Sequence, residues 1–245
     1  MRIDVALSPD AVVPTPAVAI AVDVIRATTT IAYALAQGYH EVVCCPGVED
    51  ARGAAAEIGP QAVLAGEVDR LPPEGFALGN SPREYAEGLP LGDVLVLSTT
   101  NGTRAVCWAA SNASLALVGS LANLTSCAAA AARAARAAKG SVVVRCAGAD
   151  GDVCLDDSYV AGRLVAELSA YLPEWQLGDT AELVRASAGS YASEIEAIGR
   201  SSSAASLREF DLFDDVRICA RVDAVPGVIE AVALDGGRAR AFSSR

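Results

Sequence analysis

The sequence predicts a three-layer α/β/α fold with a mostly parallel, mixed sheet. Apolar, β-branched stretches such as Ala17–Val24 and Ser141–Cys146 alternate along the chain with segments of helical spacing. These stretches are apolar on both faces, as in parallel strands that helices cover from both sides. The composition agrees, because 52% of the 245 residues are hydrophobic and 20% are charged, as in a folded globular chain.

Strands and helices alternate regularly through the first part of the chain. After the strand at Ala17–Val24, a helix is expected over Thr29–Gln37, because Gly38 supplies a residue that ends helices. Ser81-Pro82-Arg83-Glu84 has the pattern of a capping box with proline at the first helical position, so another helix begins there. The other strands expected are Glu41–Cys45, Gln61–Ala65, Asp93–Ser98, Leu115–Val118 and Ser141–Cys146. The other helices expected are Val48–Ile58, Thr103–Ala110 and Leu121–Ala138.

The remaining part of the chain is less regular. Helices are expected near Asp157–Tyr171 and Thr180–Ala188. Glu194–Leu207 is polar and serine-rich, which predicts a mobile loop at Ser201–Ser203. Two strands are expected at Val216–Arg221 and Val228–Leu234, and Asp235-Gly236-Gly237 then turns a hairpin. No clean linker divides the chain, so one domain over residues 1–245 is expected, with two closely packed lobes as the alternative.

The charge of the chain argues against several kinds of partner. A net charge of −11 disfavours DNA and RNA, whose phosphates require a basic face, and it disfavours an anionic membrane surface. The alanine-rich run Ala128–Lys139 contains Arg133 and Arg136, which predicts a helix at the protein surface rather than a membrane span. The first residues show no signal peptide, so a cytoplasmic protein is expected.

The thiols and the single histidine exclude common catalytic centres. The seven cysteines form no Cys-x-x-Cys motif, so they are expected to be small buried hydrophobic residues. Five alanines separate Cys127 from Arg133, which makes a helix and not a phosphatase loop. His40 alone would have to serve any histidine triad or zinc site, and it precedes a short strand. The chain also has no Walker loop and no Gly-x-Gly-x-x-Gly turn after a strand.

Two segments share a pattern that favours bound anions: Val22–Thr30 and Leu97–Arg104. Each passes from an apolar strand into a turn with an arginine and several hydroxyls, and each then opens a helix. Helix N-termini present free N–H groups and a partial positive charge. Arg26 and Arg104 could each donate hydrogen bonds to two oxygens of a phosphate or sulfonate, although both could instead form surface salt bridges. The carboxyl ends of strands in such sheets commonly hold the ligand, so these turns are expected to converge on one crevice.

Oxygen ligands dominate the turns at the expected strand ends. The carboxylates there are Asp23, Glu67, Asp150, Asp152, Asp156 and Asp157. Hard oxygen ligands select Mg²⁺ or Mn²⁺ rather than zinc or copper. Asp156 and Asp157 have an alternative explanation, because acidic residues also stabilise a helix N-terminus as caps. Asp23 is harder to explain in that way, since it interrupts an apolar strand just before Arg26.

Taken in order, these motifs resemble the 2-phosphosulfolactate phosphatase family. The resemblance covers roughly residues 18–230 and includes the tail Asp215–Gly227. The motifs that carry it are Val22–Thr30 (VDVIRATTT), Gly66-Glu67, Leu78–Glu84 (LGNSPRE), Ser98–Arg104 (STTNGTR) and Gly148–Gly162 (GADGDVCLDDSYVAG). It implies a Mg²⁺-dependent phosphatase that acts on a three-carbon phosphorylated sulfonic acid. In organisms that make coenzyme M, the product sulfolactate is an intermediate in its biosynthesis.

The resemblance also implies which residues form the site. The implied catalytic residues are Asp23, Arg26, Glu67 and Arg104. The implied substrate-binding residues are Thr28, Thr29, Thr30, Asn80, Ser81, Thr99, Thr100, Asn101, Gly102 and Thr103. The implied ligands of Mg²⁺ are Asp23, Glu67, Asp156 and Asp157. Two departures stand out: Asp156-Asp157 replaces a usual Glu-Asp, and Val68-Asp69-Arg70 follows Gly66-Glu67 where a glycine-rich stretch is expected.

The residues leave both the function and the route of catalysis with alternatives. The leading hypothesis is metal-assisted hydrolysis of a phosphate monoester by water, with a carboxylate that positions or deprotonates it. A covalent route with Asp23 as the nucleophile is the alternative. A different function is a non-catalytic α/β module that binds an anionic metabolite. The expected partner in each case is a small anionic molecule, and the sequence leaves homo-oligomer formation open.

Overall fold

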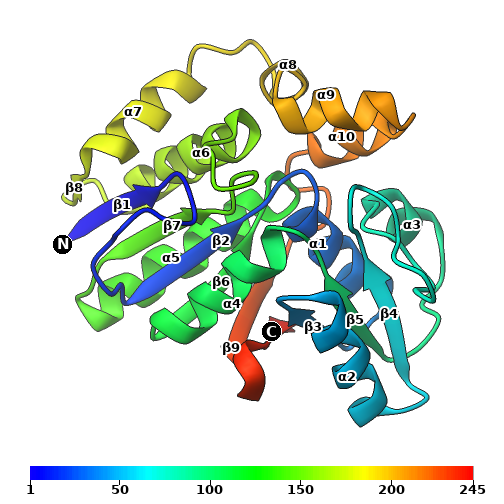
Figure 1. Ribbon diagram of the computed structural model, residues 1–245. Helices are drawn as coiled ribbons and strands as arrows, with labels where there is room; N and C mark the ends of the chain where they lie inside the picture. Colours follow the sequence, from blue (N-terminus) through cyan, green and yellow to red (C-terminus); the bar gives the residue numbers. More distant parts are fainter. Residues whose placement is uncertain (245) are drawn as a thin grey trace.

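The computed structural model describes residues 1–244 and contains ten strands and ten α-helices within that range (Figure 1). The strands are β1 Arg2–Ala6, β2 Val18–Val22, β3 Glu41–Cys45, β4 Ala62–Gly66, β5 Val94–Ser98, β6 Leu115–Gly119, β7 Val142–Cys146, β8 Gln176–Leu177, β9 Val228–Ala233 and β10 Ala239–Ser244. The α-helices are α1 Ala27–Gln37, α2 Val48–Ile58, α3 Pro82–Glu87, α4 Gly102–Asn112, α5 Leu124–Ala138, α6 Leu155–Tyr171, α7 Asp179–Ala188, α8 Glu194–Ile198, α9 Ser202–Glu209 and α10 Phe213–Cys219. Short 3₁₀ turns lie at Leu121–Asn123 and Asp235–Gly237.

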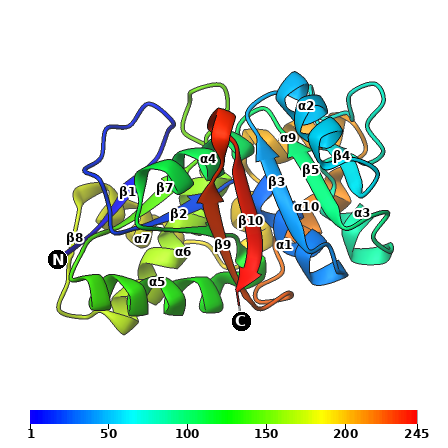
Figure 2. The same ribbon diagram turned by 90° about the horizontal axis from the view of Figure 1, so that it is seen from below.

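All of these strands join one mixed sheet in the order β4-β5-β3-β10-β9-β6-β2-β7-β1-β8. The group β4-β5-β3 is parallel, as is the group β6-β2-β7-β1-β8, and the antiparallel hairpin β9-β10 joins the two groups (Figure 2). The two groups therefore run in opposite senses. Each strand in a twisted sheet is rotated by about 20–25° from its neighbour. Over several strands this rotation adds up, so the strands of one group are far from antiparallel to those of the other. The predicted mostly parallel α/β sheet is confirmed.

The central strand β2 shows why its sequence is apolar throughout. All five of its residues are buried. Val18, Ile20 and Val22 pack with α5 and α6 on one face of the sheet. Ala19 and Ala21 face the other side, where α4 packs against the strand (Figure 2). Small residues on that face let the helix approach closely, so the turn after β2 and the N-terminus of α4 become neighbours.

Two sequence predictions about the last third of the chain are wrong. Ser201 lies in no mobile loop: it is buried, and its hydroxyl caps α9 by accepting a hydrogen bond from the backbone N–H of Ala204 at 3.1 Å. The segment expected as a strand, Val216–Arg221, belongs mostly to α10. A short apolar run does not distinguish a strand from a buried helix, and here Val216 and Cys219 are spaced to face the core together.

Other differences concern element ends and hydrogen bonds. The strand β1 and the short edge strand β8 were not predicted. The predicted helix Leu121–Ala138 begins as a 3₁₀ turn before α5. The predicted capping box at Ser81 is absent, because its hydroxyl makes no cap and bonds to Asp215 instead. All seven cysteines are free and buried, as expected. No helix within residues 1–244 is long and apolar enough to cross a membrane.

Gly66 ends β4 at a point where no other residue fits. Its φ is +146°, and a Cβ there would lie 1.9 Å from the carbonyl oxygen of Ser98 on β5. We therefore expect Gly66→Ala to lower the free energy of unfolding in urea by at least ~2 kcal/mol. Gly53→Ala in α2 is the matched control, since its Cβ would meet nothing within 4 Å, and it should stabilise the protein by about 0.5–1 kcal/mol. Equal effects of both substitutions would show that the close approach of Gly66 to Ser98 is not a constraint.

Candidate active site

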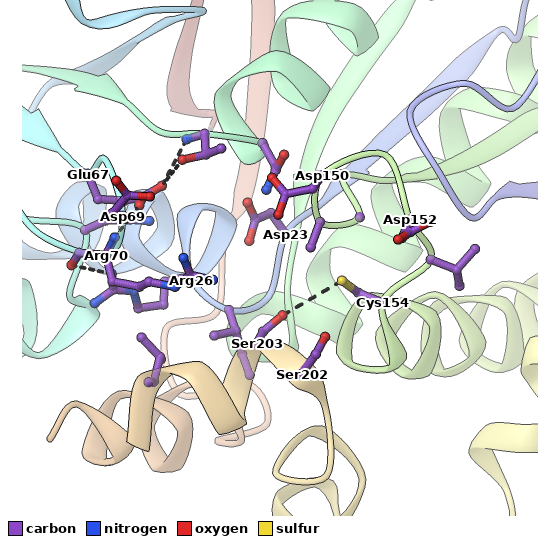
Figure 3. Close-up of a pocket in the computed structure, with 18 residues that line it drawn as sticks. Asp23, Arg26, Glu67, Asp69, Arg70, Asp150, Asp152, Cys154, Ser202 and Ser203 are labelled. Carbon is purple, nitrogen blue, oxygen red and sulfur yellow. Dashed lines mark hydrogen bonds between the residues drawn. The ribbon is translucent and has the colours of Figure 1, made fainter. Parts of the chain in front are cut away.

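A pocket of about 350 Å³ lies where several loops of the sheet meet (Figure 3). Its walls come from the loops after β2, β4, β5 and β7 and from the start of α9. Figure 3 shows Glu67, Asp69 and Arg70 on one side, Asp150, Asp152 and Cys154 on the other, and Asp23 and Arg26 between them. The structure thus brings the carboxyl ends of four strands, from both parallel groups, to one crevice.

The pocket includes some of the residues named from the sequence and adds others. The predicted site residues that line it are Asp23, Arg26, Glu67, Asn80, Thr100 and Asn101. Lining residues outside the predicted site include Asp69, Arg70, Asp150, Asp152, Cys154, Ser202 and Ser203. The carboxylates of Asp150 and Asp152 carried a sequence signal, because they follow a predicted strand. Ser202 and Ser203 were missed because their segment was expected to be a loop.

Arg26 is held in the pocket by a buried ion pair. Its Nη1 donates to Asp215 Oδ2 at 2.9 Å, and both side chains are at most 4% exposed. The hydroxyl of Ser81 donates to the other oxygen of Asp215 at 2.6 Å. Arg26 Nη2 donates to the carbonyl of Arg70 at 3.2 Å. The guanidinium is therefore fixed before any ligand arrives. The tail that begins at Asp215 is part of the family resemblance, but nothing local in the sequence indicated its contact with Arg26, which is 189 residues away.

The three threonines after Arg26 do not line the pocket. Thr28 Oγ1 donates to the carbonyl of Asp23 at 2.8 Å, and Thr29 Oγ1 donates to the carbonyl of Val24 at 2.8 Å. Thr30 Oγ1 donates to the carbonyl of Asn80 at 2.9 Å. These hydroxyls are buried and already used within the protein. The expectation that they bind substrate is corrected: they hold the loops that carry Asp23 and Asn80.

In the segment after β5, some side chains bond to neighbouring protein groups and others line the pocket. Thr99 and Thr103 bond to each other across the first turn of α4, with the N–H of Thr103 donating to Thr99 Oγ1 at 3.1 Å. Thr100 donates through its N–H and its hydroxyl to Glu67 Oε1, each at 2.9 Å. A Cβ at Gly102 would lie 2.2 Å from Asp23 Oδ2, so glycine lets the start of α4 reach this carboxylate.

Arg104 lies outside the pocket, contrary to the sequence expectation. Residues Gly102, Thr103, Ala105 and Val106 are buried, which leaves position 104 on the exposed face of α4. The Nε of Arg104 donates to the carbonyl of Pro46 at 3.3 Å. The sequence pattern identified the correct turn but not the direction in which this side chain leaves the helix.

Three buried carboxylates lie at the end of β2 and the start of α6. Burial, followed by the charges of Asp156 and Glu67, raises the pKa of Asp23 to about 7. Burial also raises the pKa of Asp156 to about 6 and that of Asp157 well above its usual value. Asp157 accepts hydrogen bonds from the N–H groups of Val24 and Gly148, each at 3.0 Å. It therefore ties together the loops after β2 and β7.

The four expected metal ligands do not form a closed metal site. Asp23 and Glu67 line the pocket, whereas Asp156 and Asp157 do not. Asp156 accepts a hydrogen bond from Ser203 at 3.2 Å, and both oxygens of Asp157 are used by backbone N–H groups. Over residues 1–244, no group of three or more His, Cys, Asp and Glu side chains is placed to hold a metal ion. A cation here would need ligands from water or from substrate.

Comparison with known proteins identifies relatives along nearly the whole chain. The family model described as 2-phosphosulpholactate phosphatase matches residues 6–233. A protein of Thermus thermophilus named probable 2-phosphosulfolactate phosphatase is 41% identical over 222 residues, which are 91% of this chain and 91% of that protein. A protein of the same name from Deinococcus radiodurans is 36% identical over 222 residues, 91% of this chain and 90% of its own. The resemblance predicted from the motifs is confirmed.

The buried carboxylates predict how stability depends on pH in the metal-free protein. The folded-state pKa values of Asp23 and Asp156, about 7 and about 6, lie above the ordinary value of 3.8. The folded state then holds more protons than the unfolded state between about pH 4 and 7, so stability should fall as pH rises through this window. Asp23→Asn should unfold at the same temperature as the parent near pH 4. At pH 8 it should gain at least ~1 kcal/mol, or about 2–4 °C.

Asp93→Asn provides the control for this experiment, because Asp93 is an exposed carboxylate just before β5 and lies at no helix N-terminus. It should change the melting temperature equally at both pH values. The measurement is thermal unfolding followed by circular dichroism from pH 4 to 8 in EDTA. A melting temperature of Asp23→Asn that is no higher than that of the parent at pH 8 would show that ionised Asp23 carries no burial penalty.

Proposed function

The chain belongs to the 2-phosphosulpholactate phosphatase family, and we propose that it hydrolyses 2-phosphosulfolactate to sulfolactate and phosphate with the help of Mg²⁺. The observation that carries this proposal is the pocket itself, in which a preset arginine and the buried carboxylate of Asp23 lie where loops from the ends of four strands meet. Phosphoryl transfer depends mainly on positioning and on neutralising charge, and these are the groups that do both.

Arg26 is the residue that we assign to the phosphate. Its guanidinium lines the pocket, and Asp215 and the Arg70 carbonyl fix its orientation. A planar guanidinium can donate to two phosphate oxygens at once. Asn80 supports this assignment, because its side chain is buried, lines the pocket and leaves Oδ1 without a partner. The amide N–H groups of Asn80 can donate to the phosphate oxygens, whereas Oδ1 is an acceptor and can only receive a hydrogen bond from the substrate or contact a cation.

The charge balance of the pocket supports Mg²⁺ as the cofactor. Five carboxylates line it, from Asp23, Glu67, Asp69, Asp150 and Asp152, against the guanidinium groups of Arg26 and Arg70. A phosphate dianion would be repelled there without a cation. Magnesium commonly uses one or two carboxylates, with waters and phosphate oxygens as its other ligands, and this needs no closed protein cage. Glu67 would hold it through Oε2, which accepts only the Arg70 N–H within the described residues and faces the pocket loop, with Asp23 beside it. The bound ion would neutralise charge on the transferred phosphoryl group.

We propose that water is the nucleophile and that Asp23 takes its proton. In the metal-free protein the pKa of Asp23 is raised to about 7, and a bound Mg²⁺ would lower it, so Asp23 would be ionised and able to accept a proton at neutral pH. Water then attacks phosphorus, the bond to the ester oxygen breaks, and the leaving oxygen gains a proton. In the covalent alternative, Asp23 itself attacks phosphorus. The stereochemistry at phosphorus separates the routes, because direct attack by water inverts a chiral phosphoryl group, whereas two successive displacements through Asp23 retain its configuration.

The cellular setting is part of the proposal. All seven cysteines are buried free thiols, including Cys44 and Cys45, which are adjacent in the sequence. Unpaired thiols are usual in a reducing compartment, which supports a cytoplasmic enzyme. By the resemblance described above, its product would serve coenzyme M biosynthesis in organisms that make this coenzyme.

Replacing the two arginines by lysine separates a pocket role from a surface role. Arg26→Lys keeps the charge but loses the planar pair of donors, so kcat/KM should fall by about 10–150-fold, equivalent to ~1.5–3 kcal/mol. Arg104→Lys should stay within about threefold of the parent, because Arg104 bonds to Pro46 on the exposed face of α4. Steady-state kinetics with Mg²⁺ checks both. A large loss in Arg104→Lys would contradict the placement of that side chain.

Phosphate release from a small set of esters tests the function. We expect 2-phosphosulfolactate to exceed p-nitrophenyl phosphate by at least about tenfold in kcat/KM, or ~1.4 kcal/mol, because its other anionic groups can be recognised. Phosphorylated two- to four-carbon acids complete the set. Activity should disappear in EDTA and return with Mg²⁺. Tight binding of one of these compounds without release of phosphate would favour the binding module, and full activity after exhaustive EDTA treatment would exclude the metal.

A further inference from the structure

A tight turn at Val68–Leu71 forms one wall of the pocket. The N–H of Val68 donates to the carbonyl of Leu71 at 3.0 Å, and the N–H of Leu71 donates back at 3.2 Å. The two central residues, Asp69 and Arg70, have φ values of +51° and +71°. Both line the pocket, and Figure 3 places them beside Glu67. The turn therefore presents an arginine to the pocket from a backbone conformation that side chains other than those of Gly, Asn and Asp rarely adopt.

The backbone of this turn is fixed from two directions. The N–H of Arg70 donates to Glu67 Oε2 at 2.9 Å, and its carbonyl accepts from Arg26 Nη2 at 3.2 Å. Any residue at position 70 would make these two contacts, because they use only backbone atoms. Aspartate followed by glycine is a sequence that two-residue turns with positive φ prefer. An arginine side chain is therefore not required for this turn, and its presence calls for another explanation.

The Arg70 guanidinium is uncommitted, unlike the other arginine of the pocket. Arg26 is paired with Asp215. Within residues 1–244, the Arg70 side chain makes no hydrogen bond and has no carboxylate oxygen within 4.0 Å of its nitrogens, although Glu67 and Asp69 belong to the same loop. The side chain is exposed at the mouth of the pocket. It can therefore meet an anion that enters with the substrate without breaking an existing ion pair.

We propose that Arg70 determines substrate specificity by binding the second anionic group, the sulfonate, of the substrate. This inference rests on the proposed function, because it assigns the phosphate to Arg26 in the same pocket. A sulfonate presents oxygens that a guanidinium can engage in pairs, as it does with carboxylate and phosphate. The two arginines are linked through the Arg70 carbonyl, so the two anion-binding positions are held in a fixed relation. The substrate class is a small phosphate ester with a sulfonate near the ester carbon.

Arg70→Gly tests this proposal without disturbing the turn, since glycine adopts positive φ readily and keeps both backbone contacts. KM for 2-phosphosulfolactate should rise at least about tenfold, whereas KM for p-nitrophenyl phosphate should change less than about twofold. Arg70→Lys, which keeps the charge, should lie between Arg70→Gly and the parent. Arg133→Gln, which removes an exposed arginine from α5, should match the parent on both substrates.

Binding of the product separates this proposal from the proposed function. Sulfolactate carries the sulfonate without the phosphate, and calorimetry measures its Kd without any catalysis. We expect Arg70→Gly to weaken sulfolactate at least about tenfold and to leave inorganic phosphate within about twofold. A parent protein that binds sulfolactate in this Arg70-dependent way but does not hydrolyse 2-phosphosulfolactate would refute the proposed function alone. Equal losses for both ligands, unchanged binding of both, or no binding of sulfolactate to the parent would overturn the role of Arg70.

Discussion

The burial of three neighbouring carboxylates is the constraint on which the site depends. Asp23, Asp156 and Asp157 are almost fully buried, and their raised pKa values show that the fold stabilises their charge poorly. Burying unpaired charge is costly, so the protein offers these groups backbone and hydroxyl donors instead of cations. Asp157 uses the donors to join the loops after β2 and β7. Asp23 is left with its carboxylate facing the pocket, where a cation and a reacting water would find it.

The same pocket depends on contacts between distant parts of the chain. The pair of Arg26 and Asp215 joins the loop after β2 to α10, and Ser81 adds the start of α3. Removing one partner of a buried pair leaves an isolated charge and commonly costs about 3–5 kcal/mol. Glu67 likewise joins the loops after β4 and β5 through Thr100. These polar links bring the ends of oppositely directed strand groups to one place.

The fold could be predicted from the sequence further than the site. Glu41–Cys45 and Val48–Ile58 match β3 and α2 residue for residue, because their apolar patterns and flanking turn residues are local signals. The pairing of Asp215 with Arg26 could not be predicted, since the two residues are 189 positions apart, although the resemblance included the tail that begins at Asp215. Arg104 was placed wrongly because a motif gives the turn but not the face of the helix. Thr28–Thr30 failed for a related reason: their hydroxyls bond to nearby carbonyls, which no pattern of residue types distinguishes from substrate binding.

A crystal structure of Asp23→Asn with Mg²⁺ and 2-phosphosulfolactate would test most directly whether this pocket is the active site. The substitution is intended to keep the substrate intact while the rest of the pocket stays unchanged. We expect the phosphate on the guanidinium of Arg26, the metal on Glu67 and the sulfonate on Arg70. A phosphate bound outside this pocket, or bound without contact to Arg26, would contradict the assignment of the pocket as the active site.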